Sequence, residues 1–122
     1  MNNLNALDAL PFVNSSKKRE PRQFWHVVGS GDYGVDCQIG ESFAHAFIGY
    51  AVNHGLIGGG ILQTVVMHIV SKYGGHVPDD EKGLIVGMFC EIEHRLALYA
   101  MAARYHEHNS LALGKQLAEC VE

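Results

Sequence analysis

Residues 79–108 constrain the fold more than any other segment, because they contain no proline and no glycine after Gly87. Three acids, Asp79, Asp80 and Glu81, follow Pro78, which is typical of a helix start because carboxylates suit the positive end of the helix. At about 100° per residue, one arc collects seven apolar residues: Ile85, Met88, Phe89, Ile92, Leu96, Tyr99 and Ala103. We therefore expect a long helix over 79–108 whose apolar face is buried.

A second helix is expected over 37–54. Asp36 is a good N-cap residue for it, and Gly55 stands at the usual left-handed position that closes a helix. Gly40 and Ala44 are four residues apart at the edge of its apolar side, which would let another helix approach closely.

Two shorter helices complete the prediction. Residues 61–73 lie between the glycine joint 58–60 and Gly74, and although their β-branched residues would also suit a strand, their apolar period favours a helix. Asn109 and Ser110 are expected to break the long helix before a last helix over 111–121. The sequence thus predicts an all-α fold, a compact bundle of four main helices around one long central helix (about 79–108), with an irregular N-terminal arm.

The N-terminal arm, residues 1–23, is expected to be weakly structured or poorly ordered, and residues 24–122 to form a single helical domain. Alternatively, a short helical or extended piece of the arm packs against the body through four apolar residues: Leu4, Leu7, Leu10 and Phe12. The apolar run 24–28 is either a strand or an irregular segment that caps the core. We favour the irregular segment, because no partner strand is evident.

Composition narrows the function classes. The 122 residues suffice for one domain with a real core, and no apolar run is long enough to cross a bilayer, so we expect no membrane span and no signal peptide. Three scattered cysteines, Cys37, Cys90 and Cys120, argue against a disulfide framework and favour a reducing cytoplasm.

The net charge of −4 divides unevenly between the arm, at +2, and the remaining body, at −6. An acidic body disfavours binding to nucleic acid, because phosphates require a basic surface. Only the basic arm, with Lys17, Lys18, Arg19 and Arg22, would contact nucleic acid.

The segment Gly29–Gly34 matches the Gly-x-Gly-x-x-Gly pattern of dinucleotide-binding turns. The fold that uses this turn needs several parallel strands and an acid about 20 residues later, whereas this chain has Asn53 and His54 there. We interpret the glycines, Gly34 included, as a loop that needs positive φ angles.

Five residues form the predicted metal-ligand set. Glu91 and His94 have the Glu-x-x-His spacing of helical metal sites, in which both side chains share one face. Glu41 and His45 on the second helix, with His68 on the third, would complete the set. The di-metal bundle pattern asks for a second such motif that is missing here, and an exposed ion pair is the cheaper explanation of Glu41 and His45.

No complete catalytic set is present, since no turn presents Ser42 as a nucleophile and Cys37 is a common type of residue at a helix start. If a small molecule binds, Trp25, His26 and Tyr33 beside the glycine-rich turn are expected to line its pocket, between the second helix and the long one.

We expect a non-enzymatic helical interaction or accessory protein that acts as a homodimer and has an unidentified protein partner; the alternative is a bundle that binds a divalent metal or a small molecule. The long helix has a second apolar strip opposite its core face, which one chain of this size would struggle to cover. We predict this strip as the dimer interface: Cys90, His94, Ala97, Leu98, Met101 and Tyr105.

Overall fold

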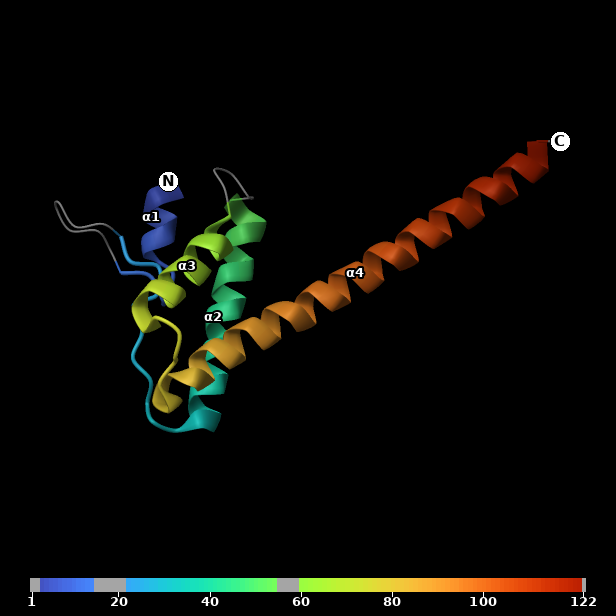
Figure 1. The fold of residues 1–122 in the computed structure, drawn as a ribbon. Helices are drawn as coiled ribbons and strands as arrows, with labels where there is room; N and C mark the ends of the chain where they lie inside the picture. Colours follow the sequence, from blue (N-terminus) through green and yellow to red (C-terminus); the bar gives the residue numbers. More distant parts are fainter. Residues whose placement is uncertain (1–2, 15–21, 55–59, 122) are drawn as a thin grey trace. The chain divides into compact units, whose positions relative to one another are not determined.

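A computed structural model describes residues 3–14, 22–54 and 60–121, with side chains described over 6–14, 22–54 and 60–107. The helices of these residues, labelled in Figure 1, are α1 (Asn3–Asp8), α2 (Tyr33–His54), α3 (Ile61–Tyr73) and α4 (Asp79–Val121). Within these ranges the β structure amounts to an isolated antiparallel bridge between Asn14 and Gln23. The predicted all-α class is therefore confirmed.

The chain divides into two units, residues 1–91 and residues 92–122, and the boundary falls inside α4. The first unit contains α1, α2, α3 and the first turns of α4, while the described part of the second unit is helix alone. None of the helices in the described part of the chain combines the length and the apolarity that crossing a bilayer requires.

Three aromatic rings from separate segments form the centre of the first unit's core. Phe12 precedes the bridge, Trp25 follows it, and Phe43 belongs to α2; the ring centroids lie 5.7 to 6.2 Å apart. All three rings are buried. Offset or tilted aromatic pairs at this spacing are favourable in addition to the area that they bury. α3 and α4 contribute further fully buried side chains: Val65, Leu84 and Met88.

The described part of the N-terminal arm belongs to this core. Leu7, Leu10 and Val13 are buried along with Phe12, and the Arg22 guanidinium pairs with the Asp8 carboxylate at 2.8 Å. The short helical piece that we gave as the alternative for this arm is α1. Lys17, Lys18 and Arg19 lie outside the described residues, as do Gly58 and Gly59 of the glycine joint.

Residues 24–28 form the irregular capping segment that we predicted. Trp25 and Val27 are buried, and the His26 N–H donates to the Phe12 carbonyl oxygen at 2.9 Å. The Lys72 ammonium group of α3 donates to the Val27 carbonyl oxygen at 2.9 Å. The segment therefore satisfies backbone groups through the arm and α3, without a strand partner.

Glycines bring the backbones of α2 and α4 into direct contact in the first unit. A Cβ added at Gly40 would overlap the Leu84 carbonyl oxygen and approach the Met88 nitrogen to 2.8 Å. From the other helix, a Cβ added at Gly83 would approach the Tyr33 carbonyl oxygen to 2.8 Å, and one at Gly87 would overlap the Cys37 carbonyl oxygen. The close approach predicted at Gly40 is thus confirmed, and it requires small residues on both helices.

The start of α2 differs from the prediction. The helix begins at Tyr33, because the Asp32 carboxylate accepts from the Val35 N–H at 3.0 Å and so caps it one turn earlier than expected. Asp36 is instead a buried residue of the first turn, and its carboxylate accepts from the Ser30 N–H at 2.9 Å. Gly34 consequently lies within α2, and the positive φ of this segment, 89°, is found at Gly31.

α3 matches its predicted bounds and is a helix, so the strand alternative for this segment is wrong. It ends at Gly74, which has a φ of 70° and donates its N–H to the Val70 carbonyl oxygen at 2.9 Å. This ending suits glycine, since a positive φ costs it little.

α4 begins at Asp79 as predicted but continues without a break to Val121, so the expected break at Asn109 and Ser110 is wrong. Both residues are only slightly poorer helix formers than their neighbours, and good helix formers such as Leu, Lys and Gln follow them. The expectation of a fully buried apolar face on this helix is also wrong: Met88 is fully buried, but Leu96 and Tyr99 are 61% and 54% exposed.

Candidate metal-ligand cluster

Two helices of the first unit bring three predicted ligands together. Glu41 and His45 lie one turn apart on α2, and Glu91 lies on α4. One ligand atom from each residue, a carboxylate oxygen or an imidazole nitrogen, lies within 4.8 Å of the other two. The His45 Nε2 atom and the Glu91 Oε1 atom are 3.2 Å apart.

The cluster lies at the surface, and its members differ in exposure. The side chain of His45 is 50% exposed and that of Glu91 is 13% exposed, while Glu41 is exposed as a residue. The sequence suggested an ion pair within α2 between Glu41 and His45. The structure adds a hydrogen bond between His45 and Glu91 of the other helix.

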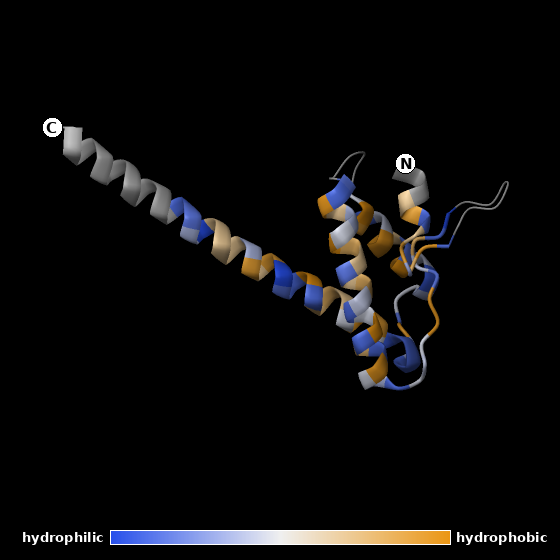
Figure 2. Ribbon diagram, turned by 180° about the vertical axis from the view of Figure 1, so that it is seen from behind, coloured by the Kyte–Doolittle hydropathy of each residue, from blue (hydrophilic) through white to orange (hydrophobic). Residues whose placement is uncertain are grey.

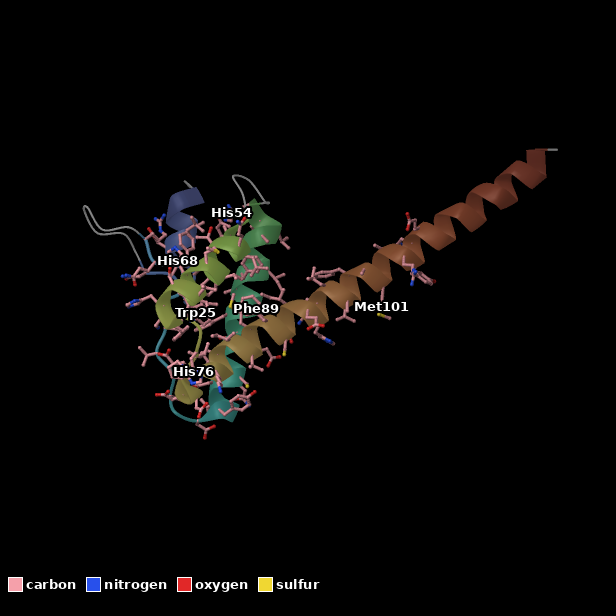
Figure 3. All side chains as sticks on the ribbon, viewed as in Figure 1. Trp25, His54, His68, His76, Phe89 and Met101 are labelled. Carbon is pink, nitrogen blue, oxygen red and sulfur yellow. The ribbon has the colours of Figure 1, made fainter. Side chains whose placement is uncertain are left out.

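The other two predicted ligands lie elsewhere. His68 of α3 accepts at Nδ1 from the Phe24 N–H at 3.1 Å, and its ring meets the Phe24 ring edge-on at 5.4 Å. Figure 3 labels His68 on α3. His94 is an exposed residue of the second unit and is not a member of the converging group. His68 therefore holds the capping segment in place, because it satisfies a backbone donor there.

A shallow pocket of about 270 Å³ adjoins the cluster in the first unit. Glu41 and Glu91 line it together with Val86, Cys37 and Cys90. Both cysteines are free thiols. A side-chain hydrogen bond with Cys37 raises the pKa of the nearby Tyr33 phenol. The pocket thus combines carboxylates with two soft sulfur groups.

The residues predicted to line a small-molecule pocket separate into two places. Trp25 and His26 line a pocket of about 450 Å³, whose other walls include Arg22 and residues His68, Ser71 and Lys72 of α3. Tyr33 does not line this pocket; it is 55% exposed at the start of α2. The pocket therefore adjoins α3, whereas the prediction placed it between α2 and the long helix.

Trp25 is held in the core by a hydrogen bond, because its Nε1–H donates to the Tyr73 hydroxyl at 3.1 Å. Burial raises the pKa of Tyr73 well above its usual value, and a side-chain hydrogen bond to Glu81 raises the pKa further. Burial and Glu81 therefore favour the neutral form of the Tyr73 phenol, and they outweigh the opposite effect of the hydrogen bond from Trp25.

All six residues of the predicted interface strip are exposed on α4. Cys90 belongs to the first unit, and His94, Ala97, Leu98, Met101 and Tyr105 belong to the second. Met101, labelled in Figure 3, is 67% exposed, and Tyr105 is 66% exposed. Figure 2 shows hydrophobic and hydrophilic residues following one another along the visible side of the coloured part of α4.

Two features of the first unit were not predicted from the sequence. The spacing of Gly83 and Gly87 is a small-residue pattern that could have signalled the close approach from the side of α4. The second is that the Asp36 carboxylate accepts from the Ser30 N–H. No local signal in the sequence distinguishes this role of Asp36 from that of an N-cap residue.

The fold and the site are those of an all-α protein that has a Glu/His cluster in its first unit and a second unit described as helix alone. No protein family matches the chain, and no curated protein or solved structure is significantly similar to it. Its function is consequently inferred from the residues themselves.

Proposed function

We propose that the protein is a non-enzymatic helical interaction protein that pairs with a second copy of itself through the second unit of α4. The observation that carries this proposal is the exposure of the three large apolar side chains of the strip: Leu98, Met101 and Tyr105. Exposed apolar surfaces of this kind usually mark interfaces.

The second unit lacks, in its described part, a second element against which these side chains could pack. Most helices in proteins owe their stability to packing of an apolar face, because helix propensity alone is marginal in water. Full burial of each large apolar side chain contributes about 1.5–3 kcal/mol before entropic costs. Association would therefore stabilise this helix as well as cover it.

The charges beside the strip favour a second copy as the occupant. Glu93 and Arg104 are both exposed and lie eleven residues apart in α4, which places them roughly 20° apart around the helix. In an antiparallel two-fold pair centred between Leu98 and Tyr99, each Glu93 faces the Arg104 of the other copy. Two-fold pairs are also the commonest closed assemblies.

The compartment proposed for this pairing is a reducing cytoplasm. Cys37 and Cys90 are both free thiols, and free thiols persist where disulfides are kept reduced.

Light scattering coupled to gel filtration tests the assembly. The expected mass is twice the 13.4 kDa of one chain. Met101→Asp should shift the protein toward monomer, because it places a charge within the apolar strip. The matched control is Val52→Asp on α2, since Val52 is 76% exposed and lies outside the strip. A wild-type protein that remains monomeric at tens of micromolar would rule the proposal out.

A charge exchange tests the identity of the partner and the direction of the pair. Glu93→Arg alone should weaken the dimer, because it places like charges together, and Glu93→Arg combined with Arg104→Glu should restore it. If the double variant associates no better than the single one, the antiparallel pair of identical chains is wrong.

A further inference from the structure

The three converging side chains of the first unit have the composition of a transition-metal site. Glu41 and Glu91 provide carboxylate oxygens and His45 provides an imidazole nitrogen, each within 4.8 Å of the others. Imidazole with carboxylate suits zinc and its first-row neighbours, whereas magnesium and calcium prefer oxygen ligands alone.

The spacing of the ligand atoms fits such an ion. Zinc binds imidazole nitrogen and carboxylate oxygen at about 2.0–2.2 Å, so two neighbouring ligands of a tetrahedral site lie roughly 3.3 Å apart. The His45 Nε2 and Glu91 Oε1 atoms are 3.2 Å apart. The Glu41 ligand atom lies within 4.8 Å of those of the other two residues, so rotation about its side-chain bonds has to shorten this separation for it to bind the same ion.

The backbone positions behind these ligands are fixed by the glycine contacts between the helices. Glu41 follows Gly40 directly, and Glu91 is one turn beyond Gly87. Gly40 and Gly87 each have the backbone of the other helix within the space that a Cβ would occupy. The ligands from α2 and α4 are therefore presented from rigid elements, which favours a defined site.

The adjoining pocket provides room for a further ligand. It has a volume of about 270 Å³ and is lined by Glu41 and Glu91, so it reaches the cluster itself. Three protein ligands leave a tetrahedral ion with one open position, which a water molecule or a small anion fills in such sites.

We propose that Glu41, His45 and Glu91 bind one divalent transition-metal ion per chain, with zinc as the expected occupant, and that the ion links α2 to α4. The ion bonds to the imidazole Nε2 and to one oxygen of each carboxylate, all of which are unprotonated when they bind it. Such a link stabilises the folded first unit in proportion to the occupancy of the site.

Calorimetric titration of untagged, chelator-treated protein with zinc tests this site. One ion should bind per chain, and the melting temperature should rise with zinc. Glu91→Gln and His45→Gln should each weaken zinc binding by at least about tenfold, since even the partners of metal ligands commonly contribute that much. Glu107→Gln on α4 and His76→Gln are matched controls, because both residues are exposed and lie outside the cluster; they should leave the affinity unchanged.

Two further measurements distinguish this site from one built on the neighbouring thiols. The double variant Cys37→Ser/Cys90→Ser should keep the zinc affinity. If this double variant loses zinc binding while Glu91→Gln retains it, the site is a thiolate site and the proposal is overturned. Cobalt absorption spectra should change on His45→Gln, because that variant removes the nitrogen ligand. Met101→Asp should still bind one ion, so failure of the dimer leaves this test intact. No stoichiometric zinc in the wild-type protein would refute the site.

Discussion

At the residue scale, two glycines of α2 have opposite surroundings. A Cβ at Gly40 would meet the backbone of α4 at Leu84 and Met88, while a Cβ at Gly49 would have no atom within 4 Å. We expect Gly40→Ala to lower the free energy of unfolding by roughly 1–3 kcal/mol, since backbone atoms cannot move aside cheaply. Gly49→Ala should raise it by up to about 1 kcal/mol, because alanine is the better helix former. Urea denaturation measures both, and equal shifts of the two midpoints would contradict the close contact.

Tyr73 predicts a loss of stability at alkaline pH. Burial raises the pKa of its phenol, so the folded chain favours the neutral form. In the unfolded chain the phenol ionises near pH 10, so this stabilisation is complete below about pH 10 and is lost as the pH rises above that value.

Urea denaturation at pH 8 and at pH 11 measures this loss. Tyr73→Phe should be less stable at pH 8, because Trp25 loses its acceptor, but its stability should fall less between the two values. Tyr99→Phe, at an exposed side chain outside the strip, is the control and should behave as wild type. An unchanged fall in Tyr73→Phe would show that other groups cause the alkaline loss.

At the element scale, the continuity of α4 through Asn109 and Ser110 is testable by a substitution. In a continuous helix, Ser110→Pro removes a hydrogen bond and clashes with the preceding turn, at a cost of about 3 kcal/mol. We expect helical Cα chemical shifts on both sides of residue 110 in the wild-type protein and their loss near this position in the variant. If wild-type residues 109 and 110 already have coil shifts, the helix is broken there, as the sequence pattern predicts.

At the scale of the whole molecule, helix content should depend on protein concentration. The second unit is described as helix alone and exposes the three large apolar side chains of the strip, so pairing and helix formation are expected to be linked. Dilution should reduce the circular dichroism signal at 222 nm and lower the melting temperature. Met101→Asp should show the diluted behaviour at every concentration. A wild-type signal that does not change on dilution through the range where the mass falls would separate helix formation from pairing.

Local patterns in the sequence were sufficient to predict α3 and the start of α4. The apolar period of residues 61–73 and the glycine after them determine α3, because period and end signal both act within a few residues. The start of α2 was placed one turn late because Asp32 and Asp36 are equally good caps in sequence. In the tertiary structure the Asp36 carboxylate accepts from the Ser30 N–H, and Asp32 is the residue that caps α2.

The candidate site shows the same division between local and tertiary information. Sequence spacing alone placed Glu41 with His45, and Glu91 with His94, on shared helix faces, because side chains three or four residues apart lie on one side of a helix. It could not determine which faces meet. The glycine contacts at Gly40 and Gly87 bring Glu91 to His45, whereas His68 accepts a hydrogen bond from the Phe24 N–H. Composition and periodicity determined an all-α chain, whereas the tertiary structure decided which ligands converge, because their convergence depends on how closely two backbones pack.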